Sequence, residues 1–412
     1  MRRGRFLPMM QRLSYFRKRW YTAFPLVLSI FSLTMPSLAE NLYVQAATAG
    51  STGNNVLQIV DSTTFGVLAS FTLPPPLPVG GAYEELAVTP GGGKIYLCVR
   101  SVVAVITPSM NSVVELPYDC GDIAVSPDGS KVYVTRASNS VSVLSSDSDT
   151  LAATIALNAP AHGIVVTPNG NRAYIDGAGG VLVVDTQANT QIGTVPGITG
   201  GDMRKMAVTP DGRFVYIPGT SSFAVFVVDT NTNTLIAEIP ATAPVSVAIT
   251  PDSAHAYVGT GFSSAFVVDT STNAVVATLG APVGNQNIGI SSDGSRAYVY
   301  DNVDFADTVY VVDTITNNIT TSFPIAFNTV PGTIAVSPPQ ITAQQATQNI
   351  INNVSNLVSQ GALNSGEGNS LATKLQAAIN QLNNGNSKAA RGQINSFINE
   401  VNALINSGIL SS

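Results

Sequence analysis

Charged residues, histidine and cysteine are all scarce in this 412-residue chain: 11% of residues are charged, two are histidine and two are cysteine. The histidines, His162 and His255, are too few for a three-histidine zinc site and leave a Ser-His-Asp triad little to work with. The cysteines, Cys98 and Cys120, cannot build a disulfide-dense scaffold, so they allow one disulfide at most. No apolar run after residue 39 is long enough for a membrane span, and we expect none in the mature chain.

The first 39 residues differ in composition from the rest of the chain. They hold seven of the 19 Lys and Arg residues and no acid. The apolar run that follows the basic residues, 23–39, is too short and too interrupted by proline for a membrane helix. Because Ser37 and Ala39 suit a cleavage site before Glu40, residues 1–39 are predicted to be a signal peptide. The expected location is the periplasm, the medium or the cell surface.

Cleavage there would leave 12 basic against 25 acidic residues, a net charge near −13. Affinity for nucleic acid depends on Lys and Arg displacing counterions from phosphates. The composition therefore argues against a nucleic-acid partner.

One phrase recurs through the chain at a period of about 41 residues. Its seven copies are LAVTPGGGKIYL (86–97), IAVSPDGSKVYV (123–134), IVVTPNGNRAYI (164–175), MAVTPDGRFVYI (206–217), VAITPDSAHAYV (247–258), IGISSDGSRAYV (288–299) and a truncated IAVSPP (334–339). A second phrase of the type VVDTNTN follows most copies. Each repeat is therefore predicted to form four short antiparallel strands.

Turn chemistry explains the recurring polar letters. In the first phrase Pro presets φ, Asp or Asn caps its own backbone, and Gly takes the left-handed site of the hairpin. In the second, an Asp stands four residues before an Asn that tolerates positive φ, as in Asp229 and Asn233. These residues are interpreted as folding residues.

The ends of the repeat region complement each other. A lone second strand (41–48) opens it, and a lone first strand (332–339) closes it. Pairing the two would complete a seventh blade and leave no exposed inner edge.

The repeated AVSPDG, the Tyr-Val that follows it and the VVDTxTN phrase resemble the YVTN family of β-propeller repeats over residues 41–338. The resemblance implies an all-β, seven-bladed β-propeller of four-stranded blades at 40–339. Departures are few, such as Ser292 in place of Pro and Gly91 in place of Asp. The Gly-His and Trp-Asp dipeptides typical of WD repeats are missing, which argues against that family.

Residues 340–412 change to helical spacing and are predicted to form a three-helix module. The apolar stripes begin at Ile350, Leu371 and Ile394. The segment resembles a helical module at the ends of secreted bacterial proteins, which implies attachment or spacing.

Polar loops that enter the innermost strands form the candidate ligand site. His162 lies in such a loop, whereas His255 lies within a strand and is interpreted as structural. Equivalent loops carry the other candidates: Glu84, Glu85, Asp122, Arg204, Lys205, Gln286 and Asn287. Together they could surround one mouth of the central channel, although every propeller has polar loops there.

Two further features are weaker candidates. Asp301, Asp304 and Asp307 share one loop and could bind calcium, but their spacing matches no EF-hand and solvated acids explain them equally well. Cys98 and Cys120 face the same end of the ring and are expected to form a disulfide, with two buried thiols as the alternative.

Three functions remain open on the sequence alone. The favoured one is a non-enzymatic exported protein that recognises a protein, peptide or glycan through loops on one face, without a cofactor. The second is a channel-mouth enzyme for a small sugar acid or lactone, a chemistry found among related propellers. The third is a structural surface or matrix component, suggested by the low charge.

Overall fold

The computed structural model describes most of the repeat region and much of the C-terminal region. The described residues are 40–48, 55–73, 85–99, 102–118, 120–135, 139–177, 179–198, 205–262, 264–283, 287–301, 308–325, 329–330, 333–337, 351, 354–355, 358, 363–384, 386–407 and 409. Two compact units divide the chain, one spanning Ala39–Pro339 and the other including Gln340–Ser412. Among the described residues no helix is both long and apolar enough to cross a membrane.

The first unit is built from seven antiparallel sheets, numbered here as blades 1 to 7 with the inner strand first. Blade 1 consists of β4 (Leu86–Val88), β5 (Ile95–Val99), β6 (Val102–Thr107) and β7 (Ser112–Leu116). Blade 2 consists of β8 (Ile123–Val125), β9 (Lys131–Thr135), β10 (Ser140–Ser145) and β11 (Thr150–Ala156). Blade 3 consists of β12 (Ala161–Val166), β13 (Arg172–Gly177), β14 (Gly180–Asp185) and β15 (Thr190–Val195). Blade 4 consists of β16 (Ala207–Val208), β17 (Phe214–Gly219), β18 (Ala224–Asp229) and β19 (Thr234–Pro240). Blade 5 consists of β20 (Pro244–Ile249), β21 (His255–Thr260), β22 (Ser264–Asp269) and β23 (Ala274–Val283). Blade 6 consists of β24 (Asn287–Ile290), β25 (Arg296–Asp301), β26 (Thr308–Asp313) and β27 (Asn318–Pro324). Blade 7 is β29 (Ile334–Ser337), β1 (Asn41–Thr48), β2 (Asn55–Asp61) and β3 (Val67–Thr72), with the short β28 (Thr329–Val330) also pairing with β1.

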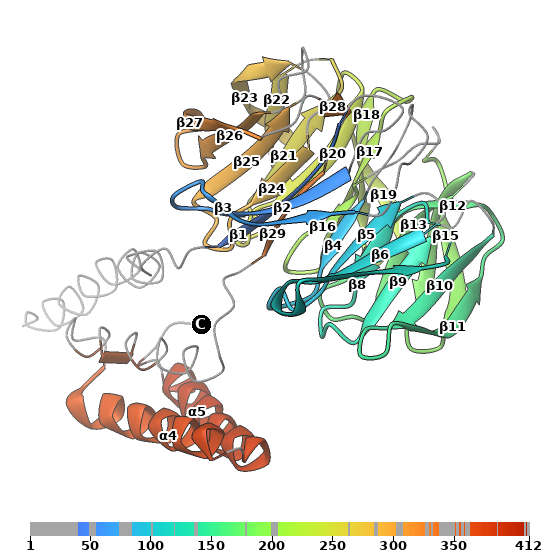
Figure 1. Ribbon diagram of the computed structural model, residues 1–412. Helices are drawn as coiled ribbons and strands as arrows, with labels where there is room; N and C mark the ends of the chain where they lie inside the picture. Colours follow the sequence, from blue (N-terminus) through green and yellow to red (C-terminus); the bar gives the residue numbers. More distant parts are fainter. Residues whose placement is uncertain are drawn as a thin grey trace, which may run out of the picture. The chain divides into compact units, whose positions relative to one another are not determined.

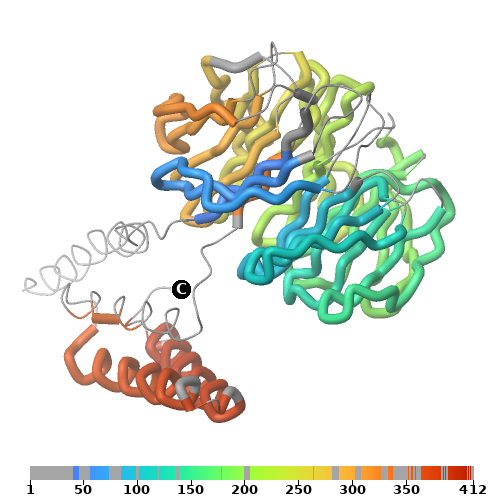
Figure 2. Tube along the Cα trace, viewed as in Figure 1, coloured from blue at the N-terminus to red at the C-terminus, as the bar shows by residue number. Residues whose placement is uncertain are grey.

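Blade 7 joins the two ends of the repeat region and closes the ring, as predicted. Strand β29 pairs with β1 in a register that sets Val44 opposite Ile334 and Leu42 opposite Val336. The inner strands contact each other from β4 through β8, β12, β16, β20, β24 and β29 back to β4. Figure 1 shows the blades following one another in sequence order, and Figure 2 shows the blue N-terminal strand beside the orange end of the repeats. The unit is a seven-bladed β-propeller.

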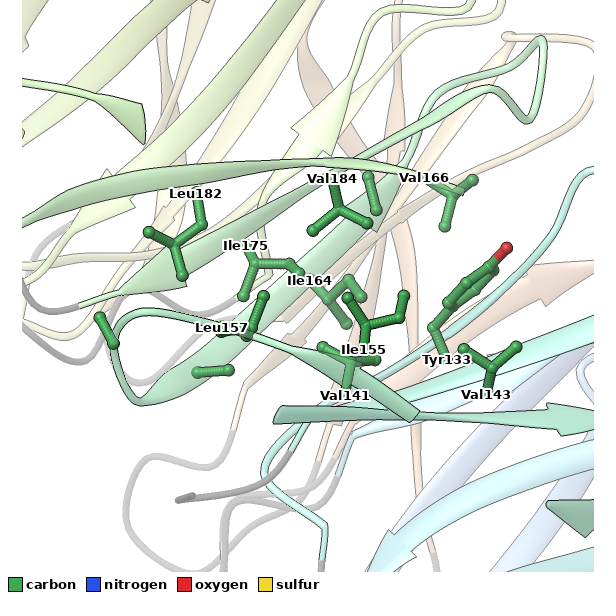
Figure 3. Close-up of a cluster of buried hydrophobic side chains, with 13 residues drawn as sticks. Tyr133, Val141, Val143, Ile155, Leu157, Ile164, Val166, Ile175, Leu182 and Val184 are labelled. Atoms are coloured by element: carbon green, nitrogen blue, oxygen red, sulfur yellow. The ribbon is translucent and has the colours of Figure 1, made fainter. Parts of the chain in front are cut away.

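The hydrophobic core lies between neighbouring blades. Alternate residues of a central strand point to opposite faces of its blade. Because a neighbouring blade covers each face, both sets of side chains are buried and the strand's sequence is an unbroken apolar run. Between blades 2 and 3, Val141 and Val143 of β10 meet Ile164 of β12 and Leu182 and Val184 of β14 (Figure 3). The outer strands expose alternate side chains.

The recurring tyrosine links blades 1, 3, 4 and 5 to the blade that follows each of them. Four buried tyrosine hydroxyls donate to the side chain at the left-handed position of the following blade's second turn: Tyr96 to Asp149 (2.7 Å), Tyr174 to Asn233 (2.7 Å), Tyr216 to Asn273 (2.7 Å) and Tyr257 to Asn317 (2.6 Å). The φ angles of those acceptors lie between 54° and 56°, which confirms the predicted left-handed site. The left-handed residue of the second turn therefore has two roles: it closes its own hairpin and it links neighbouring blades.

The C-terminal unit contains two fully described helices, α4 (Ser365–Asn383) and α5 (Ser387–Asn406). Helix α4 begins with a capping box, because Asn364 Oδ1 accepts from the Glu367 amide (3.0 Å) and the Glu367 carboxylate accepts from the Asn364 amide (2.9 Å). An ion pair of 2.6 Å joins Lys374 of α4 to Glu400 of α5. Much of the first predicted helix lies outside the described residues, but Ile351, Val354, Ser355 and Val358 are helical.

Candidate functional site

The residue that precedes the repeated phrase has an equivalent place in every blade. The seven residues in this mouth ring are Glu85, Asp122, Gly163, Lys205, Ser246, Asn287 and Thr333. Because the phrase carries the inner strand of each blade, the mouth ring surrounds one end of the central channel. The side chains of Glu85, Asp122, Ser246 and Thr333 are buried, and Asn287 and Lys205 are half-buried.

Lys205 reaches across this mouth. Its ammonium donates to the Thr333 hydroxyl of blade 7 and lies 3.5 Å from Glu85 Oε2 of blade 1, although Lys205 itself belongs to blade 4. The backbone of Lys205 is left-handed, with φ of 43°, a conformation that residues other than glycine rarely adopt. This position joins three blades and fixes Thr333, which directly precedes the closing strand β29.

Asp122 is a buried acid of the mouth ring. Its two carboxylate oxygens accept from the backbone amides of Ile123 (2.6 Å) and Ile164 (2.7 Å). Burial, and then the neighbouring charge of Glu85, raise the pKa of Asp122 to about 8, although both amides and Lys205 oppose the rise. Asp122 therefore holds its proton more tightly than an exposed aspartate does.

His162 lies within β12, not in the loop before that strand as predicted, and it is beside a carboxylate that sequence reasoning missed. Its Nδ1 is 3.7 Å from Asp176 Oδ2 at the end of β13, and its backbone carbonyl accepts from the Thr135 hydroxyl at 2.5 Å. The His162 side chain is 44% exposed and that of Asp176 is 1% exposed. The sequence did offer a signal, because Asp176 is charged where other copies of the second strand carry an uncharged residue such as Thr135.

The structure thus brings together some of the predicted site residues and not others. Glu85, Asp122 and Lys205 converge at the mouth ring, and Asn287 opens β24 within it. Glu84, Arg204 and Gln286 lie outside the described residues.

The predicted calcium loop is described only at Asp301, which is buried at the end of β25, whereas Asp304 and Asp307 fall outside the described residues. Within the described ranges, no three His, Cys, Asp or Glu side chains are grouped so that they could hold a metal ion. His255 begins β21 and bonds through its amide to the Thr250 hydroxyl at 3.0 Å, which suits its structural interpretation.

A disulfide joins Cys98 and Cys120, with a Cα–Cα distance of 5.5 Å. It links the end of β5 in blade 1 to the segment that enters blade 2. The Cys98 amide donates to the Glu85 carbonyl at 2.8 Å, and Cys120 lies two residues before Asp122. The disulfide therefore braces the two segments that supply the carboxyl groups of the mouth ring.

Comparisons with known proteins agree with this architecture. Residues 347–412 match the family model of the FIMAH domain. The seven-bladed beta-propeller protein Rv1057 of Mycobacterium tuberculosis (strain ATCC 25618 / H37Rv) is 31% identical over 137 residues. That match covers 31% of this chain and 34% of Rv1057, so it spans about a third of the relative's length.

Three solved structures share the fold at low sequence identity. Hydrazine synthase of Kuenenia stuttgartiensis aligns with a TM-score of 0.51 and 17% identity, over 67% of this chain and 93% of that one. A functionally unknown protein from Desulfotomaculum acetoxidans DSM 771 gives 0.55 and 16%, over 72% and 99%. Dihydro-heme d1 dehydrogenase NirN in complex with DHE gives 0.52 and 16%, over 71% and 74%. These three similarities bear on the fold alone. Taken with the other comparisons, they show a chain that combines a seven-bladed β-propeller with a C-terminal segment that matches the FIMAH domain.

Proposed function

We propose that this chain is an exported cell-surface recognition protein without catalytic activity. Residues 1–39 direct export, and loops on one face of the propeller bind a protein, peptide or glycan. The FIMAH match at 347–412 suggests the cell-surface role. The basic and apolar segments before Glu40, with the small residues at the cleavage site, support export.

One observation carries the binding proposal: the titratable groups Glu85, Asp122 and Lys205 of the mouth ring are held by partners within the protein. Lys205 is held by Thr333 and Glu85, and both oxygens of Asp122 accept backbone amides. A catalytic group must instead reach a substrate. The recurring Asp, Asn and Tyr residues likewise serve turns and contacts between blades, which leaves recognition to the variable loops.

A thermal-shift screen of the full chain tests this function. The panel holds peptides and oligosaccharides on one side and lactones and sugar acids on the other. A ligand at 100 times its dissociation constant adds about 2.7 kcal/mol to the stability of the folded state. We expect stabilisation by peptides or oligosaccharides and no turnover of lactones. Turnover that His162→Ala abolishes would overturn the proposal.

A second function, the channel-mouth enzyme, is favoured by one feature. A buried acid with a pKa near 8 beside a second carboxyl and a lysine is an arrangement often found at catalytic sites. If Asp122 acts as a proton donor to a small lactone, hydrolysis should fall at high pH. Glu85→Gln, which removes one cause of the raised pKa, should move that fall to lower pH. A rate that Glu85→Gln leaves unchanged across the pH range would contradict it.

A further inference from the structure

An open surface pocket of about 650 Å³ lies between blades 4 and 5. Blade 4 contributes Phe223, from the loop between β17 and β18, and Thr242, which follows β19. Blade 5 contributes Ser264 and Phe266 of β22 and Thr278 of β23. The volume is within the range of about 300–1,000 Å³ that is usual for small-molecule sites.

The lining is uncharged but carries three hydroxyl groups. The residues that line it include no Asp, Glu, Lys, Arg or His. The chain as a whole carries 25 acidic and 19 basic residues. Thr242, Ser264 and Thr278 make no side-chain hydrogen bond within the part of the chain that the structure describes. Their hydroxyls can therefore donate to and accept from a ligand. An ionic ligand would find no counter-charge here.

Phe223, at the rim of the pocket, has a backbone conformation that phenylalanine disfavours. Its φ is 53°, and a bulky side chain in the left-handed region is a strained outlier. Its ring is 60% exposed, so packing inside the protein does not repay that strain. The Ala241 amide donates to the Phe223 carbonyl at 2.8 Å and fixes the loop. Strain at an exposed aromatic residue indicates a contact outside the fold.

The corresponding loop of blade 5 carries a second exposed aromatic residue. Phe262 lies between β21 and β22 and is 80% exposed. Loops at the same repeat position emerge at the same end of the propeller, so both rings are available to a ligand that extends along this rim.

We propose that this pocket binds a neutral sugar unit of a glycan, and this rests on the recognition function proposed above. A pyranose combines an apolar face of C–H groups with hydroxyls around its edge. The apolar face matches Phe223 and Phe266, and the edge matches Thr242, Ser264 and Thr278. A peptide also offers backbone amides and carbonyls to these hydroxyls, so peptide binding is the competing outcome in the test below.

The test uses the full chain and saturation-transfer NMR with defined probes. Neutral probes are cellotriose, maltotriose, mannotriose and triacetylchitotriose, and an acidic trigalacturonate serves as comparison. We expect at least one neutral trisaccharide to bind and the acidic probe to bind more weakly. Phe223→Asn should raise the dissociation constant at least tenfold, about 1.4 kcal/mol.

Phe223→Asn also separates binding from folding. Asparagine tolerates the left-handed backbone better than phenylalanine does, so the variant should melt at the same or a higher temperature while it loses the sugar. Ile315→Ala removes another exposed hydrophobic residue, 88% exposed in a distant turn of blade 6, and should bind as the parent does.

The outcomes distinguish this inference from the function on which it rests. Neutral trisaccharides that do not bind, or that bind Phe223→Asn unchanged, overturn the sugar assignment. If a peptide binds in a Phe223-dependent way instead, the sugar assignment is wrong and recognition stands. If the full chain binds no peptide and no oligosaccharide in the thermal-shift screen, the recognition function itself fails.

Discussion

Replacing Gly289 by alanine should destabilise the propeller, although the repeat pattern suggests the opposite. The equivalent residues in the other copies are Ala87, Ala124, Val165, Ala207, Ala248 and Ala335. A substitution toward this consensus would ordinarily stabilise the protein. At Gly289, however, an added Cβ would lie 2.7 Å from Val336 Cγ2 of the closing strand.

The magnitude follows from that distance. Ordinary contact begins near 3.4 Å, so Val336 must move by roughly 0.7 Å. Val336 pairs with Leu42 across β29 and β1, and valine is stiff at χ1, so little relief is available. Overpacking of this kind costs about 1–3 kcal/mol, against which the lost freedom of the unfolded chain returns about 0.4–1 kcal/mol. The net loss should be about 1–2 kcal/mol.

Urea unfolding of the full chain, followed by the near-ultraviolet circular dichroism of its buried tyrosines, measures this loss. In the Val336→Ala background the clash is absent, so Gly289→Ala should cost much less there, with a coupling above about 0.5 kcal/mol. A Gly289→Ala variant more stable than the parent would refute the reasoning. An equal cost in both backgrounds would refute it too.

Three further changes test other parts of the structure. Cys120→Ser opens a disulfide with a sequence separation of 22 and should lower the free energy of unfolding by about 3 kcal/mol, measured by urea unfolding; equal stability of the reduced and oxidised parent would contradict this. Tyr216→Phe removes the 2.7 Å bond to Asn273 and should cost about 1 kcal/mol, while in a chain already carrying Asn273→Gly it should cost less. The pKa of Asp122 rises on folding from 3.8 to about 8, so its contribution to stability is complete below about pH 4 and is lost as the pH rises through 8; Glu85→Gln should lessen that loss in melting temperatures taken from pH 4 to 9, and parallel curves would count against it.

The sequence predicted the fold well because each blade repeats the same local chemistry. Turn residues such as Asp229 and Asn233 fix the hairpins through local contacts, and Asp229 accepts from the amides of Asn231 (2.8 Å) and Thr232 (3.1 Å). The lone strands at the two ends of the repeat region predicted the closure that β1 and β29 make. The link between Tyr216 and Asn273 was missed because it joins different blades.

The site was predictable only in part. Equivalent positions before each inner strand placed Glu85, Asp122 and Lys205 at one mouth, because the repeat fixes their height in the ring. That Lys205 crosses to blades 7 and 1 depends on its left-handed backbone and the length of its side chain. The pocket at Phe223 arises from two blades whose separation no single repeat encodes.

The cell-surface location is the claim on which the proposed function depends most. Intact cells of the source organism should be labelled with a membrane-impermeant amine reagent, and the N-terminal peptide of the isolated, labelled protein should be identified by mass spectrometry. The account predicts a labelled chain that begins at Glu40. An unlabelled chain that stays inside the cell and retains residues 1–39 would contradict it.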